Sequence, residues 1–529
     1  MSASREKKIR QELAAQGIPD IKEIRAAEER KQQRRANILY GSIAAAFVLV
    51  AAALLVWNSN IIQRNSTAMS VDGVKYSAAE VDYFYNSAVN SVLNDEYAGY
   101  MSINANSPMD QQVMTDMDLM FMGITLPEGK EEMTWHDYFV DYTKQQLVSQ
   151  TAVLKAAEAE GFKFSDEMQA DLDETMTTLA DTAKASGLSL SAYLKTMFGA
   201  SMTEPIFTKI FKDALTVSYF QEAHWNELTY TTDDMTKYYT ENPDLFDVAN
   251  YEYVYFKGTA PSTTDAEGNT IAPTEEESKA AKAKAEAAAA DVLARFKAGE
   301  SLEKLAEEYE DIATYYNQEE VSYTGGVVQE WVFDADRKAG DADSLDSGAA
   351  CYVVTFHSRA RNDYFPVNVR HILCKVDDST LDVEADDYED KRQVLIDLAK
   401  AEAEALLEEY NKGAKTAESF AELASKNSDD TGSVNNGGLY SNVPKGQMVP
   451  EFNDWIFDES RQVGDTGIVF VEAANYTGYH VMYFDGVSET PYWRMQVEDT
   501  MRSNDYNEWY TSLSEGLTAE EHGGMKYVG

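Results

Sequence analysis

The sequence predicts an α+β protein of several domains: a single N-terminal transmembrane helix, a helical domain, and two related α+β domains in tandem. Three observations lead to this prediction. The chain has 529 residues, several times the length of a typical domain. Residues 38–57 are twenty consecutive residues without a charge, and two stretches of the second half resemble each other. With 44% hydrophobic and 26% charged residues, the composition is that of a globular chain.

The charge balance excludes several classes of function. The chain has 45 basic and 91 acidic residues, a formal net charge of −46. A nucleic-acid partner is excluded because a phosphate backbone requires a basic surface. Two cysteines exclude a disulfide scaffold and a cysteine-rich zinc site, and six histidines leave little material for a metal centre. We therefore expect neither a metal nor a cofactor.

The first sixty residues predict a membrane anchor. The uncharged stretch spans about 30 Å as a helix, the thickness of the hydrocarbon core of a bilayer. Ten Lys or Arg lie in residues 1–36, whereas only Arg64 follows the stretch before Lys75. This asymmetry predicts a cytoplasmic basic tail (1–36), a single-pass anchor (37–58) in the cytoplasmic membrane, and the bulk of the chain outside, in a periplasm or at a cell surface. A cleaved signal peptide is the alternative, which the long leader and the full-length apolar run disfavour.

Residues 68–245 are predicted to form a helical N-terminal domain. Asp72-Gly73 indicates a turn after a short strand, and Ser77 with Glu80 three residues later indicates the capped start of a helix. Further amphipathic helices are expected at Trp135–Glu160, Glu167–Ala185, Ser189–Phe198 and Glu204–Glu227.

The second half of the chain contains an internal duplication. Residues 301–306 match residues 419–424 at an offset of 118, and residues 331–334 match residues 455–458 at an offset of 124. Each copy is predicted to be a β-α-α-loop-β domain, at 246–360 and 365–487. The expected elements are strands Tyr251–Phe256 and Val369–Lys375, helices Glu275–Ala298 and Tyr388–Asn411, a shorter helix capped in the second copy by Ser419 with Glu422, and closing strands Cys351–Phe356 and Gly478–Phe484. Residues 488–529 are expected to hold a final helix, Tyr492–Leu517, that packs on the N-terminal domain.

The second copy carries five motifs in a fixed order. They are VRHIL (369–373), FAELASKNSDD (420–430), GGL (437–439), GQMVPEF (446–452) and TGYHVM (477–482). This series resembles that of parvulin-type peptidyl-prolyl cis/trans isomerases. With the anchor and the helical region, the chain is similar to membrane-anchored extracytoplasmic foldases of the PrsA/SurA/PpiD type. The resemblance implies an isomerase and chaperone that assists the folding of exported proteins, and unfolded or partly folded polypeptides with X-Pro bonds as partners.

The resemblance also implies a set of site residues. Rotation about an X-Pro bond requires no bond cleavage, so the site must hold the ring and favour the twisted amide. The polar residues implied are His371, Asp430, Thr477 and His480, with Asp429 left open as an alternative to Asp430. The apolar slot implied for the proline ring is Leu439, Met448 and Phe452, and the spacing of Met448 and Phe452 is that of side chains on one helical turn.

Two features qualify the expected activity. The usual GGDLG motif is GGLY here, at residues 437–440. In the first copy, the four polar positions correspond to Tyr253, Ile312, Ala349 and Tyr352, so this parvulin-like domain is predicted to be degenerate and catalytically silent, and the second to be active. Two other functions stay open: a non-catalytic membrane-anchored holdase with a parvulin scaffold, and a structural surface protein.

Overall fold

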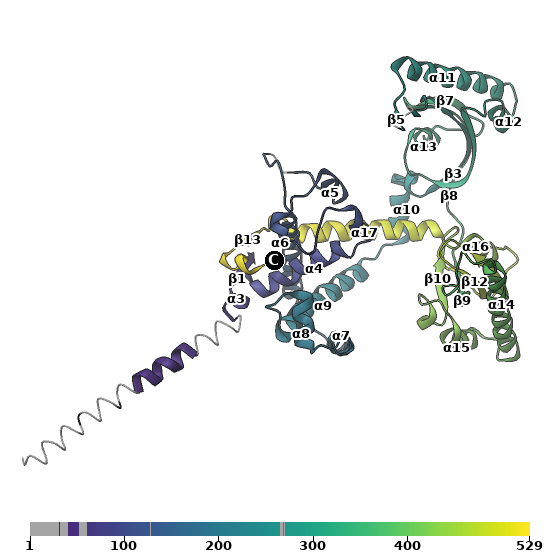
Figure 1. The fold of residues 1–529 in the computed structure, drawn as a ribbon. Helices are drawn as coiled ribbons and strands as arrows, with labels where there is room; N and C mark the ends of the chain where they lie inside the picture. The colour runs from purple at the N-terminus through teal and green to yellow at the C-terminus, as the bar shows by residue number, and fades with distance from the viewer. Residues whose placement is uncertain are drawn as a thin grey trace, which may run out of the picture. The chain divides into compact units, whose positions relative to one another are not determined.

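The structure is a computed structural model that describes residues 61–126, 129–264 and 270–529, together with Lys31, Asn37, residues 41–51 and Gly268. The described chain divides into two units (Figure 1). Unit 1 comprises the residues up to Leu228 and the C-terminal residues from Asp505, and unit 2 comprises Thr229–Asn504.

The structure describes only part of the expected transmembrane anchor. Residues 41–51 are helical, whereas 38–40 and 52–57 lie outside the described residues, as does most of the basic tail. Among the helices of the described part, none is long and apolar enough to cross a membrane.

Unit 1 is mainly helical. Its elements are α3 (Ile61–Asn65), β1 (Thr67–Val71), β2 (Val74–Ser77), α4 (Ala78–Leu93), α5 (Asp116–Phe121), α6 (Trp135–Glu160), α7 (Asp166–Ala185), α8 (Leu190–Phe198), α9 (Glu204–Glu227) and β13 (Ala519–Glu521). The bounds of the four helices α6 to α9 agree with the sequence prediction to within one residue. The short α5 and the strand β13 were not predicted.

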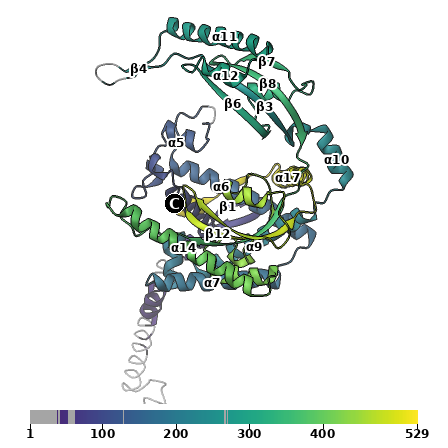
Figure 2. The ribbon, with the colours of Figure 1, turned by 90° about the vertical axis from the view of Figure 1, so that its right-hand side faces the viewer.

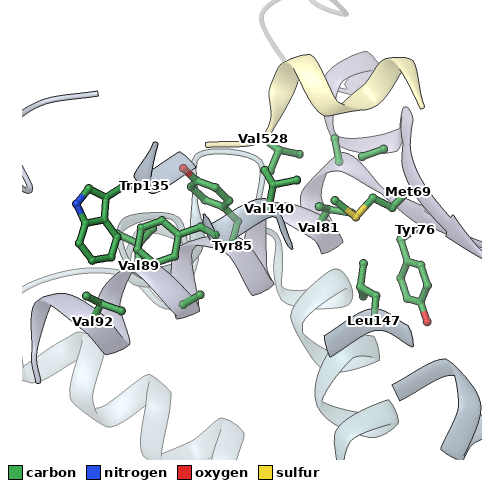
Figure 3. Packing of buried hydrophobic residues seen from close by; sticks show 14 of the residues in the cluster. Met69, Tyr76, Val81, Tyr85, Val89, Val92, Trp135, Val140, Leu147 and Val528 are labelled. Atoms are coloured by element: carbon green, nitrogen blue, oxygen red, sulfur yellow. The ribbon is translucent and has the colours of Figure 1, made fainter. Parts of the chain in front are cut away.

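A small antiparallel sheet organises the core of unit 1. Strand β13, near the C-terminus, pairs with β1, and β1 pairs with β2. The predicted capping box at Ser77 and Glu80 is present and starts α4 directly after β2. Helices α4 and α6 pack beside this sheet, where Trp135, Phe139 and Leu147 are completely buried (Figure 3).

Helix α17 (Tyr492–Ser514) contributes to both units. In unit 1, Trp509 packs with Val153 of α6 and Phe220 of α9, and its ring stacks on that of His224 at 3.8 Å. In unit 2, Trp493 and Val497 pack with residues of α10 (Thr232–Glu241). The expected packing of the final helix on the N-terminal domain is thus present for its second half.

The first α+β domain of unit 2 is built on a four-stranded antiparallel sheet of order β6-β3-β8-β7. Its elements are β3 (Asp247–Lys257), β4 (Thr263–Thr264), β5 (Thr270–Ile271), α11 (Glu275–Lys297), α12 (Leu302–Glu307), β6 (Ala313–Ser322), α13 (Val327–Val332), β7 (Ala342–Asp346) and β8 (Ala350–Arg361). Helix α11 lies across one face of this sheet (Figure 2) and buries Ala285, Ala289 and Val292 there.

The second α+β domain repeats this plan with the strand order β10-β9-β12-β11. Its elements are β9 (Val367–Lys375), α14 (Tyr388–Lys412), α15 (Ala417–Asn427), β10 (Leu439–Val443), α16 (Pro450–Ile456), β11 (Thr466–Glu472) and β12 (Thr477–Val487). Helices α14 and α15 pack on the face that carries Ile372 and Val481. Helix α16 packs on the opposite face, against Val369 and Met482.

Strand register supports the duplication. Tyr253 pairs with Val354 in the first sheet, and His371 pairs with Met482 in the second. The corresponding strands of the two copies thus lie 118 and 128 residues apart in sequence, as do Tyr253 and His371 and also Tyr352 and His480. Local contacts repeat as well. The guanidinium of Arg337 lies over the ring of Trp331 at 4.0 Å, and that of Arg461 lies over Trp455 at 4.2 Å.

Two expectations about these domains were wrong. Each domain has four strands instead of the two predicted, because the edge strands β6, β7, β10 and β11 lie in stretches that were read as loops. The cap of α15 is not Ser419 with Glu422. Thr416 is the N-cap and Ser419 is the third residue of a reciprocal capping box, so the helix begins one turn earlier.

Candidate active site

Two buried histidines face each other on adjacent strands. His371 lies on β9 and His480 on β12, and each side chain is 4% exposed. His480 pairs with Leu373 and His371 pairs with Met482, so the histidines are diagonal neighbours on the face toward α16. Their Nδ1 atoms are 2.9 Å apart. The β-sheet therefore positions the pair directly.

Asp430 completes this arrangement from the loop after α15. Its Oδ2 atom lies 2.9 Å from Nε2 of His371. The loop is held against β9, where Asp429 N–H donates to the carbonyl of Leu373 at 2.9 Å. Asp429 also lines the cavity, but its carboxylate accepts from the backbone N–H of Lys375 and makes no hydrogen bond to the histidines. Between the two acids that the sequence left open, Asp430 is the one in contact with the histidines.

Two further side chains bind Asp430, and the sequence analysis missed both. The hydroxyl of Ser433 donates to Asp430 Oδ2 and lies 3.2 Å from Nε2 of His371. The hydroxyl of Tyr440 donates to the same carboxylate oxygen at 3.0 Å. Tyr440 belongs to the GGLY sequence that departs from the usual motif, so this departure adds a donor. The serine carried no sequence signal beyond its position three residues after Asp430.

An apolar slot opens beside the histidines. Phe452 of α16 is buried, with its ring edge-on to those of His371 and His480 at 5.5 and 5.3 Å between centroids. Met448 lines the same cavity of about 500 Å³, from the loop before α16. These two side chains converge as expected, although not from one helical turn. The remaining lining includes Leu373, Tyr440, Gln447 and Tyr476.

Two residues implied by the resemblance lie elsewhere. Leu439 pairs with Arg370, on the face of the sheet opposite to His371, and does not line the cavity. Thr477 lies three positions before His480, and an odd spacing along a strand places it on the opposite face. Its hydroxyl accepts a hydrogen bond from Arg392 of α14 at 2.8 Å. The structure therefore brings together five of the seven expected site residues.

The electrostatics of the site follow from burial and these contacts. The hydrogen bond from His371 holds the pKa of Asp430 well below its usual range, with help from Ser433 and Tyr440. Burial, followed by the charge of His371, lowers the pKa of His480 to about 3. Burial also raises the pKa of Tyr440 and of Tyr476. At neutral pH the site thus holds an anionic Asp430, a neutral His480 and two protonated tyrosines.

This arrangement is suited to binding and polarisation without a covalent step. Ser433 lies 3.2 Å from Nε2 of His371, but it is buried and its hydroxyl donates to Asp430, so it is not arranged as a nucleophile activated by the imidazole. In the part of the chain that the structure describes, no cluster of His, Cys, Asp and Glu could hold a metal ion.

The first α+β domain has no equivalent of this site at the corresponding positions. Tyr253 and Tyr352 occupy the positions of the two histidines, with ring centroids 6.2 Å apart. Tyr253 stacks instead on Tyr316, at 4.8 Å. Whether this domain is catalytically silent stays a prediction.

Comparison with known proteins gives a family match within this region. Residues 354–484 match the model of the PPIC-type PPIASE domain. The chain is also similar to the chaperone SurA of Alcanivorax borkumensis, with 26% identity over 235 residues, which are 42% of this chain and 49% of the relative. The chain thus spans about half the length of this curated relative.

Two solved structures of bacterial proteins match this chain at low TM-scores. PrsA from Bacillus subtilis has 13% identity and a TM-score of 0.27, with 73% of this chain and 89% of that chain covered. A solved structure described with the SurA-like chaperones PEB4 and Cj1289 of Campylobacter jejuni has 13% identity and a TM-score of 0.17, with 84% of this chain and 94% of that chain covered. TM-scores this low carry no argument about function.

Proposed function

We propose that this chain, in which residues 354–484 match the PPIC-type PPIASE domain and which is similar to the chaperone SurA, catalyses cis/trans isomerisation of X-Pro bonds in exported polypeptides and also holds those polypeptides while they are unfolded. The observation that carries the catalytic half is the network of His371, His480 and Asp430 beside the slot of Phe452. The evidence for the holding half lies in unit 1.

The site lowers the rotational barrier by preferring the twisted amide. Resonance in a planar amide places negative charge on the carbonyl oxygen, and this charge is lost when the C–N bond twists. With the ring in the slot, the amide lies near the anionic Asp430, which raises the energy of the planar forms relative to the twisted form. A group that discriminates in this way accelerates the reaction, because only differential stabilisation of the transition state does so.

The holding half is supported by an apolar surface on unit 1, which we name the Met–Tyr surface. It consists of the exposed side chains Tyr97, Tyr100, Met117, Met120 and Phe121 and of two hollows that share Met122, Tyr138 and Tyr142. Met120 and Tyr100 are 68% and 71% exposed, and Phe121 stacks on Tyr97 and Tyr100. Flexible methionines and flat aromatic rings adapt to many apolar partners.

The charge around this surface indicates which segments it binds. Asp95 lines one hollow and Asp141 lines the other, in a chain of net charge −46. Basic and apolar segments of unfolded polypeptide complement such a surface, whereas acidic segments are repelled.

We also place the protein at the cytoplasmic membrane, with residues 38–57 as a single-pass anchor and the two units outside. The support is the uncharged stretch of twenty residues and the excess of Lys and Arg before it. Resistance of the full-length chain to alkaline extraction from membranes, and loss of that resistance when residues 1–60 are removed, tests this placement. A full-length chain that alkali extracts would contradict it.

Isomerase activity is tested on the full chain by NMR exchange spectroscopy of short X-Pro peptides. We expect a rate above that of the free peptide, and its loss in the double variant His371→Ala and His480→Ala. A rate equal to background in the wild-type chain would leave the non-catalytic holdase as the better description.

The holding function is tested by light scattering of an aggregating client. The double variant Met120→Ser and Phe121→Ser should protect the client less than the wild-type chain does. Val394→Ser and Leu398→Ser provide a matched control, because these side chains of α14 are also exposed, at 57% and 61%. Equal protection by both variants and the wild type would exclude the Met–Tyr surface, and no protection by any of them would favour a structural protein.

A further inference from the structure

Tyr476 contacts the histidine pair at the end opposite to Asp430. It lies in the turn between β11 and β12, and its hydroxyl is 3.1 Å from Nε2 of His480. The turn is closed by a hydrogen bond from Ala473 N–H to the carbonyl of Tyr476 at 2.9 Å. The side chain also lines the cavity of the site. Neither the motif set nor the expected site residues included it.

We propose that Tyr476 is a positioning residue of the isomerase site, whose hydroxyl determines which nitrogen of each imidazole carries hydrogen. This inference rests on the proposed isomerase function. It concerns a single hydrogen-bonded chain that runs from Tyr476 through His480 and His371 to Asp430.

The direction of each hydrogen bond in this series of side chains can be derived from Asp430, at one end of it. Asp430 is anionic and can only accept, so His371 donates through Nε2. A neutral His371 then has a bare Nδ1, and the facing Nδ1 of His480 must donate across the 2.9 Å between them. This leaves Nε2 of His480 bare, and the hydroxyl of Tyr476 is its donor.

The hydroxyl of Tyr476 can also bind His480 when His371 carries hydrogen on both of its nitrogens. If His371 gains a second hydrogen, its Nδ1 donates to Nδ1 of His480, and His480 then donates from Nε2 to the oxygen of Tyr476. A hydroxyl can both donate and accept, which an ammonium group or an aromatic ring cannot do. Tyr476 therefore keeps the buried imidazole of His480 satisfied in both states.

The duplicated domain offers an internal comparison. Counted back from β8 and β12 at their offset of 128 residues, the position of Tyr476 corresponds to Gly348. The hairpin of β7 and β8 is four residues shorter than that of β11 and β12, and the extra residues of the longer hairpin include the turn that carries Tyr476. The hydroxyl and the histidine pair occur in the same copy.

The test compares Tyr476→Phe with Tyr479→Phe in the full chain. Both substitutions remove one hydroxyl and keep the ring. Tyr479 is the matched control, since it lies on the opposite face of β12 and packs on Phe470 at 4.8 Å between ring centroids. The readouts are kcat and KM for an X-Pro peptide and the ¹⁵N spectrum of labelled imidazoles, with His480 assigned by its loss in His480→Gln.

At a pH where His371 carries one hydrogen, we expect hydrogen on Nδ1 of His480 in the wild type and a shift toward Nε2 in Tyr476→Phe. The same variant should lose about tenfold in kcat, a typical effect of one hydrogen bond, with KM changed by less than about twofold. Tyr479→Phe should change neither readout. An unchanged imidazole spectrum in Tyr476→Phe would overturn the proposal, whatever happens to kcat. If the wild-type chain has no isomerase activity, the proposed function fails, while the spectrum still tests the hydrogen-bonded chain.

Discussion

The Nδ1 atoms of His371 and His480 lie 2.9 Å apart, although 109 residues separate the two histidines in sequence. Each imidazole has a second partner on its other nitrogen: Asp430 for His371 and Tyr476 for His480. Both rings are buried against Phe452. Contacts with Asp430, Tyr476 and Phe452 therefore fix both imidazoles before any substrate binds. Such preorganisation is what the stabilisation of a transition state requires.

Asp430 should be essential to the rate, and its neighbour Asp429 should not be. Asp430→Ala removes the carboxylate that accepts from His371, Ser433 and Tyr440 and leaves only the longer contact of 3.2 Å between Ser433 and His371. We expect kcat to fall by about ten- to hundredfold, since a hydrogen bond to a charged group contributes about 1.5–3 kcal/mol. Asp429→Ala is the control, measured in the same exchange assay. An equal loss in both variants would contradict the assignment of Asp430.

His480 should make the domain less stable as the pH falls. Its pKa is about 3 in the folded protein and about 6.5 in an unfolded chain, so the unfolded state binds more protons between these values. Its contribution to stability is complete above about pH 6.5 and decreases by up to about 1.4 kcal/mol per pH unit below it. Hydrogen exchange of the amides of β9 and β12 in the full chain, corrected for intrinsic rates, measures this slope.

Removing the imidazole provides the control for this pH dependence. His480→Gln should flatten the slope between about pH 4 and 6.5, whatever its effect on absolute stability. Asp430 acts in the same direction at lower pH, since the stability from its depressed pKa is present above about pH 4 and lost as the pH falls further. A slope that is unchanged in His480→Gln would show that other groups cause the acid sensitivity.

Substitution of Ser433 should lower the isomerase rate, and substitution of Thr477 should not. From sequence alone, Thr477 was expected in the site and Ser433 was not. Ser433→Ala removes a hydroxyl that contacts both Asp430 and His371, and we expect kcat to fall severalfold to tenfold. Thr477→Val removes a hydroxyl that binds Arg392 on the other face of β12. It should leave kcat within about twofold and cost about 1 kcal/mol of stability, measured by urea unfolding. A larger loss of kcat in Thr477→Val would place Thr477 back in the site.

Gly438 should tolerate no side chain. Its φ is +72°, and an added Cβ would lie 2.2 Å from the carbonyl oxygen of His371, beside the hydrogen bond from His371 N–H to the carbonyl of Gly438 at 2.9 Å. Gly438→Ala should therefore cost several kcal/mol and reduce exchange protection in β9. Gly446→Ala is the control: its φ is +79° with nothing within 4 Å of an added Cβ, so it bears only the conformational cost of about 1 kcal/mol. Equal losses would show that the close contact at Gly438 is unimportant.

The sequence by itself determined the features that depend on local patterns. Helical periodicity located α6 and α9 at their full bounds, and the capping signal at Ser77 marked a helix start that the structure contains. The internal repeat determined that two α+β domains share one plan. The offsets between the two copies assigned Tyr253 and Tyr352 to the positions that His371 and His480 occupy in the second copy. This assignment needs no coordinates, because two copies of one sequence form strands of the same register.

Tertiary structure alone decided which further polar side chains contact the two histidines and Asp430. The side chains of Ser433, Tyr440 and Tyr476 come from two loops and an edge strand, whose distances to the histidines depend on how the chain closes around the sheet. The physical reason is the alternation of side chains along a strand, which separates neighbours in sequence and joins residues far apart. Leu439 and Thr477 were expected in the site because they lie within its motifs, and the pleat of the sheet directs both to the opposite face.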